Sequence, residues 1–136
     1  MISCGIVVTN GSLVLGVIPW GKPKVLDLPK GQISSRETPI EAACREFFEE
    51  TGLLVSREQL ISLGKFNYLP EKDLHLFLLR TRRLPSIDTM SCGSFFTNPF
   101  GKVVPEVIGY RYAKFDDLSW YRGLQPILRD IQKIFV

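Results

Sequence analysis

The chain has 136 residues, of which 45% are hydrophobic and 23% are charged, and its formal net charge is +3. This size and composition are typical of one globular domain over residues 1–136, and they exclude a disordered or fibrous chain. No apolar run reaches the roughly 18–20 residues of a membrane span, and the cysteines lack the CxxC spacing of a zinc site, so we expect a cytoplasmic protein without a membrane anchor.

Two strands joined by a tight turn are predicted at the start of the chain. Apolar residues alternate over Ile2–Thr9 and Ser12–Ile18. Between them lies Asn10-Gly11, which favours a two-residue hairpin in which both turn positions have positive φ. A further short strand is expected over Lys24–Leu28, leading into Pro29-Lys30-Gly31.

A helix is predicted between Thr38 and Gly52. Thr38 suits the N-cap, Pro39 suits the first helical position, and Glu41 completes a capping box. Gly52 is the residue type expected just past a helix end. Four residues at helical spacing form the expected core-facing stripe of this helix: Ile40, Ala43, Cys44 and Phe47.

Further strands, a long loop and a second helix follow. An antiparallel strand pair is predicted over Ile61–Leu69 and Asp73–Arg82, and a long loop rich in proline and glycine over Leu84–Pro105. Alternation predicts a strand over Val107–Lys114, and helical spacing of apolar residues predicts a helix over Tyr121–Phe135. Hairpin-like strand pairs interleaved with helices favour an α+β fold, with a mixed-sheet sandwich and helices outside.

Three glutamates, Glu46, Glu49 and Glu50, crowd the last turns of the first predicted helix, on a different face from the apolar stripe. Like charges at such spacings cost roughly 0.2–0.5 kcal/mol per pair, and negative charge near the helix C-terminus opposes the helix dipole. A divalent cation would relieve both penalties, and Mg²⁺ prefers oxygen ligands of this kind, as does Mn²⁺. Arg45 is expected to pair with Glu49, four residues later, or to reach back to Glu37.

The segment Gly31–Leu53, GQISSRETPIEAACREFFEETGL, resembles the Nudix box, whose pattern is G-x5-E-x7-R-E-U-x-E-E-x-G-U with U a bulky apolar residue. All nine positions of the pattern are filled, by Gly31, Glu37, Arg45, Glu46, Phe47, Glu49, Glu50, Gly52 and Leu53. The resemblance implies a member of the Nudix hydrolase superfamily, with an α/β/α sandwich around a mixed β-sheet.

The resemblance also implies a metal site. Glu46, Glu49 and Glu50 match the residues that bind the metal ions in this family, and the glycine loop near Gly31 matches a backbone ligand. The expected cofactor is Mg²⁺, with Mn²⁺ as a substitute. We assign Glu49 and Glu50 to catalysis as well as to metal binding.

Other candidate site residues lie beside or beyond these glutamates. Glu37 matches the structural partner of Arg45, and we expect Arg45 to position the metal ligands as part of the catalytic apparatus. Glu106, in a loop before an aromatic-rich strand, is the candidate that assists the attacking water. Lys30 precedes the box glycine in a Pro-Lys-Gly stretch and is the candidate phosphate contact.

The remaining aromatic and basic residues carry weaker signals. His75, the only histidine, is expected to be structural, and an arginine group that includes Arg80 and Arg82 is expected to be a solvated strand end and loop. Stacking of an aromatic ring on a base contributes roughly 1–3 kcal/mol per base. Five aromatic residues are candidates for base stacking, with the last two favoured because they lie in the long loop: Trp20, Phe66, Tyr68, Phe95 and Phe96.

The expected activity is Mg²⁺-dependent hydrolysis of a diphosphate linkage in a nucleoside diphosphate derivative, most directly a nucleoside polyphosphate or a dinucleoside polyphosphate. Two enzyme alternatives stay open: pyrophosphate removal from RNA 5′ ends, and cleavage of ADP-ribose or sugar nucleotides. A third alternative is a catalytically silent Nudix-fold module that senses a nucleotide. The expected partners are therefore a nucleotide-type small molecule or an RNA 5′ end, and no membrane.

Overall fold

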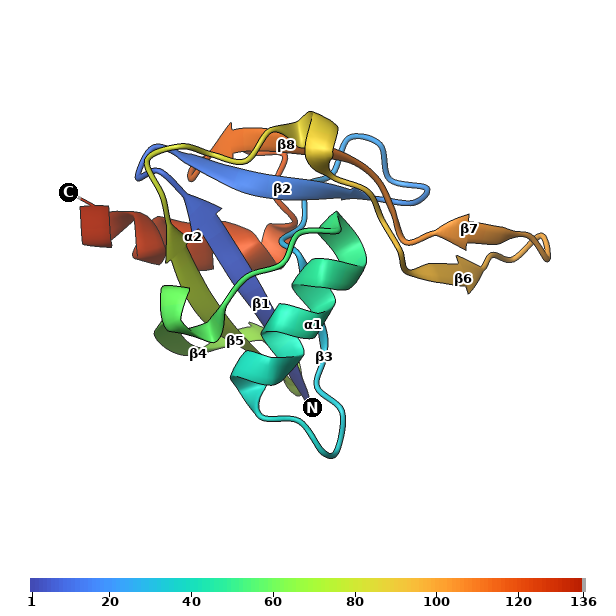
Figure 1. Cartoon of the computed structure of the whole chain (residues 1–136), viewed down its shortest axis with the longest axis horizontal. Coiled ribbons are helices and arrows are strands. Elements are labelled where there is room, and N and C mark those ends of the chain that lie inside the picture. The colour runs from blue at the N-terminus through green and yellow to red at the C-terminus, as the bar shows by residue number, and fades with distance from the viewer. Residues whose placement is uncertain (136) are drawn as a thin grey trace.

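A mixed β-sheet of six strands forms the centre of the fold, in a computed structural model that describes residues 1–135 (Figure 1). The strands are β1 (Ile2–Thr9), β2 (Leu13–Pro19), β3 (Lys30–Gln32), β4 (Ile61–Leu69), β5 (Lys72–Arg80) and β8 (Val107–Lys114). Their order is β4-β5-β1-β2-β8, with β3 paired to β1 beside this path. Only β1 and β5 run parallel among these described strands, so the predicted mixed sheet is confirmed.

Two helices cover opposite faces of this sheet. Helix α1 (Pro39–Thr51) packs Phe47 against one face, in a core cluster that includes Ile6. Helix α2 (Gln125–Gln132) packs Leu128 against the other face, in a cluster that includes Val7. Because Ile6 and Val7 are neighbours on β1, their side chains point to opposite faces and supply both cores. The predicted α/β/α sandwich is confirmed.

Strand β1 changes partner along its length, so that β1 and β2 separate on the side of the sheet where the site lies. It pairs with β2 only through Thr9 and Val14, and with β3 through Ser3 to Gly5. Between these ends, the Ile6 amide donates to the Pro29 carbonyl oxygen at 3.2 Å. The segment that leads into β3 therefore fills the gap between β1 and β2.

Two predictions for the N-terminal region were wrong in detail. Thr9 pairs with Val14, so four residues rather than two lie between the paired positions, and Asn10 does not adopt positive φ. Instead, the Asn10 side-chain oxygen accepts hydrogen bonds from the amides of Ser12 and Leu13, both at 2.9 Å. Lys24–Leu28 forms no strand: it contributes isolated bridges at two of its residues, and the strand begins later, as β3.

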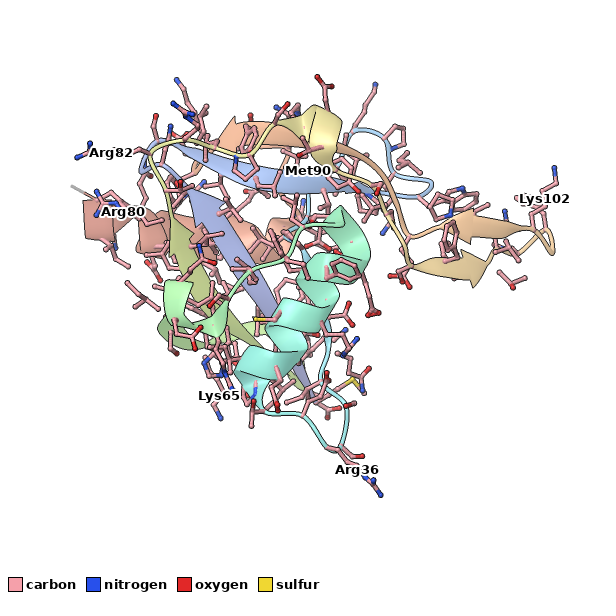
Figure 2. All side chains as sticks on the ribbon, viewed as in Figure 1. Arg36, Lys65, Arg80, Arg82, Met90 and Lys102 are labelled. Atoms are coloured by element: carbon pink, nitrogen blue, oxygen red, sulfur yellow. The ribbon has the colours of Figure 1, made fainter. Side chains whose placement is uncertain are left out.

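The long segment predicted as a loop contains regular structure. It holds a 3-10 turn, η2 (Ile87–Thr89), and a separate two-stranded hairpin, β6 (Phe95–Thr97) and β7 (Val103–Pro105). The hairpin projects from the sandwich in Figure 1, and Lys102 lies at its tip in Figure 2. Within residues 1–135 no helix is both long and apolar enough to cross a membrane.

The final predicted helix is broken into three pieces. These are η3 (Arg122–Leu124), α2 and η4 (Lys133–Phe135), and one more 3-10 turn, η1 (Arg57–Gln59), follows α1. Pro126 lies in the first turn of α2 and has no amide proton, so it cannot continue a helical hydrogen-bond ladder from the preceding turn. The chain therefore enters α2 through a 3-10 turn.

Candidate metal and nucleotide site

Helix α1 begins and ends where the sequence predicts. The Thr38 amide donates to Glu41 Oε1 at 2.9 Å, and the Glu41 amide donates to Thr38 Oγ1 at 3.4 Å, which completes the capping box. At the other end, Gly52 is left-handed with φ of 75° and donates its amide to the Phe48 carbonyl oxygen at 2.8 Å. These caps fix the register of the helix that carries the acidic residues.

Arg45 links several acidic residues of this helix and of the loop before it. Its Nε and Nη2 donate to the two carboxylate oxygens of Glu37 at 2.6 and 2.9 Å, so this pair is bidentate. Its Nη1 donates to Glu46 at 2.7 Å and to Glu49 at 2.8 Å. Both predicted pairings of Arg45 are therefore present. Its hydrogen bonds to Glu37 lower the pKa of the Glu37 carboxyl to about 2.

Gly31 lies so close to Glu46 that a side chain at this position would displace the carboxylate. A β-carbon on Gly31 would lie 2.0 Å from the Glu46 carboxyl carbon, far inside contact distance. The backbone of β3 thus lies directly against the carboxylate of α1.

Glu50 is the most buried acidic residue of the site, with a relative exposure of 6%. Its Oε1 accepts a hydrogen bond from the Lys30 amide at 3.3 Å, and its carbonyl oxygen accepts one from the Tyr110 hydroxyl at 2.6 Å. Burial, reinforced by the negative charges of Glu46 and Asp27, raises the pKa of Glu50 to about 9. The three glutamates therefore do not share one solvated face, because Glu50 turns into the protein.

The stripe predicted to face the core is confirmed in part. Ala43 and Phe47 are buried, but Ile40 and Cys44 are only partly buried, whereas Ala42 and Thr51 are fully buried, so the buried face is rotated. Small Ala side chains let the helix approach the sheet closely, and the Thr51 hydroxyl donates to the Phe47 carbonyl oxygen at 2.6 Å. This rotation carries Glu50 to the buried side of α1.

The acidic residues fit a divalent cation by charge and by donor chemistry. Burial raises the pKa of Glu46, and Glu49 and Glu106 add to this, against the opposing effect of Arg45. Two cations, Arg45 and Lys30, thus face a larger number of carboxylates around Glu46 and Glu50. Among residues 1–135, however, no three acidic, histidine or cysteine side chains converge on a single point. Metal binding by these glutamates therefore stays a prediction.

Glu106 lies in the same small cavity as Glu50. This acidic cavity has a volume of about 200 Å³ and is lined by Val17, Pro19, Asp27, Lys30, Glu50, Glu106 and Val107. The Glu106 carbonyl oxygen accepts from the Trp20 amide at 3.0 Å, and its amide donates to the Ser94 carbonyl oxygen at 2.9 Å. The exposed Glu106 side chain is thus held at the mouth of the cavity by its backbone.

A larger cleft opens from the acidic cavity and shares four of its lining residues: Pro19, Asp27, Lys30 and Glu106. This aromatic cleft has a volume of about 450 Å³ and is also lined by Trp20, Lys22, Tyr68, Leu69, Lys72, Phe96 and Tyr121. The rings of Trp20 and Phe96 meet edge to face, with centroids 5.8 Å apart. Of the stacking candidates, Trp20, Tyr68 and Phe96 line this cleft.

Lys30 lies where the two spaces join. Its Nζ is 3.1 Å from Asp27 Oδ2 and 5.2 Å from the centre of the Tyr68 ring. Burial lowers the pKa of Lys30, but Asp27, Tyr68 and Glu50 together more than offset this, so the pKa lies above its usual value. Lys30 therefore carries a positive charge that is held in place between the acidic cavity and the aromatic cleft. Asp27 carried no signal in the sequence beyond its charge.

Two groups singled out in the sequence lie away from this site. His75 Nε2 is 3.0 Å from Ser62 Oγ, and its ring stacks on Phe77 with centroids 4.7 Å apart. Arg80 and Arg82 line neither the acidic cavity nor the aromatic cleft, and they lie at the end of the molecule opposite the β6–β7 hairpin (Figure 2).

Comparison with known proteins gives sequence relatives and a shared fold. An RNA pyrophosphohydrolase of Rhizobium meliloti is 52% identical over 33 residues, which are 24% of this chain and 20% of that protein. An RNA pyrophosphohydrolase of Xylella fastidiosa is 47% identical over 49 residues, which are 34% of this chain and 26% of that protein. The matched segments thus span only about a fifth to a quarter of the length of these curated relatives.

A solved structure matches over almost the whole chain. The dihydroneopterin triphosphate pyrophosphohydrolase of E. coli superimposes with a TM-score of 0.66 at 16% identity, covering 98% of this chain and 95% of that one. This likeness establishes the fold. The family model of the NUDIX domain matches residues 1–130. The chain therefore belongs to the NUDIX domain family.

Proposed function

We propose that this protein hydrolyses a diphosphate linkage in a nucleoside diphosphate derivative, with Mg²⁺ as its cofactor. The observation that carries the proposal is the continuity of the two spaces. The acidic cavity, with Glu50 and Glu106, opens into an aromatic cleft through the shared residues Asp27 and Lys30. The acidic cavity can take the phosphate chain of a nucleotide, and the aromatic cleft can take its base.

In this proposal Glu46, Glu49 and Glu50 would hold Mg²⁺ or Mn²⁺, with the backbone of Gly31 as a further ligand. When bound there, the cation would supply charge neutralisation at the phosphate oxygens and activation of a water molecule. Arg45 fixes the rotamers of Glu46 and Glu49 through its hydrogen bonds at 2.7 and 2.8 Å. Glu37 orients Arg45 in turn, which makes it a positioning residue.

Two further residues act on the substrate. Glu106 accepts a proton from the attacking water, because it lies at the mouth of the cavity that Glu50 lines. Lys30 contacts a phosphate oxygen as a point charge, and its link to Asp27 holds it at the junction. Water adds across one phosphoanhydride bond, which breaks so that each product retains a phosphate group.

The nucleoside occupies the aromatic cleft. Trp20 and Phe96 form an edge-to-face pair on its wall. A base that stacks on these rings is bound more tightly, whichever of the bases it is. The volume of about 450 Å³ is in the range of small-molecule sites, roughly 300–1,000 Å³. A nucleoside polyphosphate or a dinucleoside polyphosphate therefore fits as substrate.

An RNA 5′ end is the second candidate substrate. Lys22 and Lys72 add positive charge to the cleft beside Lys30, which suits a chain of several phosphates. The R. meliloti relative is an RNA pyrophosphohydrolase, although only a short segment of it matches. ADP-ribose, sugar nucleotides and a silent nucleotide-sensing module are less well supported, since none of them is favoured by a specific contact.

A turnover panel tests the proposal. The substrates are nucleoside triphosphates, dinucleoside polyphosphates, ADP-ribose, sugar nucleotides and 5′-triphosphate RNA, with Mg²⁺ or Mn²⁺ and with products identified by mass. Glu50→Gln is compared with Glu58→Gln, because Glu58 lies on the surface in η1 and away from the site. Metal-dependent cleavage that is lost only in Glu50→Gln supports the proposal. Nucleotide binding without turnover on any substrate contradicts it and favours the sensor.

A further inference from the structure

A second cleft lies directly beside the aromatic cleft. This basic cleft has a volume of about 450 Å³, and its lining includes Lys22, Lys24, Tyr121, Arg122 and Gln125. Lys22 and Tyr121 line both clefts and form the ridge between them, with Lys22 Nζ 5.1 Å from the centre of the Tyr121 ring. A ligand in the aromatic cleft can therefore extend over this ridge.

The charged residues that line the basic cleft are all positive. Its lining contains three cations, Lys22, Lys24 and Arg122, and no acidic residue. Over residues 1–135 none of these three cations forms a salt bridge. The neighbouring Asp117 does not line the cleft; its Oδ1 accepts the Ser119 amide at 2.8 Å and its Oδ2 is 3.7 Å from Arg111. Exposed cations without acidic partners attract a phosphate group.

The order of the three spaces limits the substrate. The basic cleft shares residues with the aromatic cleft but none with the acidic cavity. The spaces therefore run from acidic cavity to aromatic cleft to basic cleft. A dinucleoside polyphosphate has its phosphates between its two nucleosides, so with one nucleoside in the aromatic cleft it leaves the basic cleft empty. A 5′-phosphorylated RNA does match this order. Its 5′ phosphates would lie at the acidic cavity, its first nucleoside in the aromatic cleft, and its linking phosphate and second nucleoside at the basic cleft.

We propose that the basic cleft binds the second nucleotide of an RNA 5′ end whose first nucleoside occupies the aromatic cleft. Lys22 on the ridge, and Lys24 and Arg122 in the basic cleft, contact the phosphate that links the first nucleoside to the second. Tyr121 is only partly buried and lines the basic cleft, so it gives the second base an aromatic contact beside Lys22. This inference rests on the proposed function for its placement of the 5′ phosphates.

The experiment compares ATP with the RNA dinucleotide pppApA in the wild type and in the double variant Lys24→Ala/Arg122→Ala. Both residues line the basic cleft only. We expect a KM for pppApA about tenfold below that for ATP in the wild type, and about equal KM values in the variant, from loss of the contacts to the linking phosphate. Lys65→Ala is the matched control, because Lys65 is an exposed cation on β4 that lines none of the three spaces.

Binding of pApA and AMP in EDTA provides a second readout that needs no turnover. Tighter binding of pApA that disappears in the double variant supports the subsite even if no substrate is cleaved, in which case only the proposed hydrolysis fails. Cleavage of ATP with equal KM for pppApA, unaffected by the variant, overturns the subsite and leaves hydrolysis standing. A variant that impairs diadenosine tetraphosphate but not pppApA also overturns the RNA assignment.

Discussion

Gly31 and Glu46 are in direct contact across the space between β3 and α1, where a β-carbon on the glycine would lie 2.0 Å from the carboxyl carbon of the glutamate. The same carboxylate accepts a hydrogen bond from Arg45 at 2.7 Å. Its position is thus fixed by a missing side chain on one side and a guanidinium on the other. The glycine of the box has a steric reason to be there, independent of its backbone conformation.

Gly31→Ala should displace the Glu46 carboxylate while leaving the fold intact. The clash is with the end of a side chain, so we expect the free energy of unfolding to change by less than about 1 kcal/mol. Metal-dependent kcat/KM should fall about 10–100-fold, as when ligand orientation is disturbed. The matched control is Gly93→Ala, whose new β-carbon would meet its nearest neighbour, the Glu49 carbonyl oxygen, at 3.8 Å. Unchanged kcat/KM in Gly31→Ala would show that Glu46 is not held by this contact.

Glu37→Gln should weaken both stability and the metal site. The Glu37–Arg45 pair is bidentate, but 37% of the Arg45 side chain is exposed, so we expect a loss of only about 1 kcal/mol at pH 7. The pKa of Glu37 is lowered to about 2, so its contribution is complete above its ordinary pKa and is lost as pH falls toward 2. Urea unfolding between pH 7 and pH 3 measures this.

The control for Glu37→Gln is Asp130→Asn, which breaks the exposed pair of Asp130 with Lys133. It should change the free energy of unfolding by less than about 0.5 kcal/mol. If both variants lose the same stability at every pH, the Glu37 pair has no special role.

Glu50→Gln should change how stability depends on pH when metal is absent. The pKa of Glu50 is raised to about 9, so the folded state binds more protons than the unfolded state above the ordinary pKa of a glutamate. The stabilising contribution is complete below that ordinary pKa and is lost as pH rises through about 9. The variant should therefore be the more stable protein at pH 8 in EDTA, by about 1–3 kcal/mol.

Urea unfolding at pH 5, 6, 7 and 8 in EDTA measures this effect. The two proteins should converge toward pH 5, because there the glutamate of the unfolded wild type approaches its ordinary pKa and also begins to bind the proton. Parallel curves for wild type and Glu50→Gln across this range would mean that the buried carboxyl does not titrate as described.

Phe96→Ala should raise KM for nucleotide substrates with little effect on kcat. Phe96 lines the aromatic cleft and meets Trp20 edge to face, so its loss removes part of the surface for the base. We expect an increase in KM of about fivefold to tenfold. Phe95→Ala is the control, because Phe95 is the exposed neighbour that does not line the cleft. Equal effects of the two substitutions would place the base elsewhere.

The helix and its hydrogen-bonded partners were predictable from the sequence because they depend on local spacing. The caps at Thr38 and Gly52 and the pairing of Arg45 with Glu37 and Glu49 involve residues within one helix and its preceding loop. Burial of Glu50 was not predictable in the same way. It depends on how closely α1 packs on the sheet, which the small residue Ala42 permits.

The clefts were less predictable because distant segments build them. Trp20 follows β2, Tyr68 belongs to β4, Phe96 to β6 and Tyr121 precedes α2. Sequence reasoning named three of these aromatic residues only as members of a longer set, because no local pattern separates a ring in a cleft from one in the core. The hairpin that carries Phe96 was predicted as loop, since its strands have three residues each and show no clear alternation.

Titration with Mn²⁺, followed by calorimetry in wild type, Glu50→Gln and Glu58→Gln, measures whether the glutamates of α1 bind the metal. We expect the wild type and Glu58→Gln to bind Mn²⁺ alike, and Glu50→Gln to bind it at least about tenfold more weakly. Binding in the wild type should tighten as pH rises, because Glu50 must lose its proton to act as a ligand. Equal affinity in all three proteins would contradict the assignment of the metal to these glutamates.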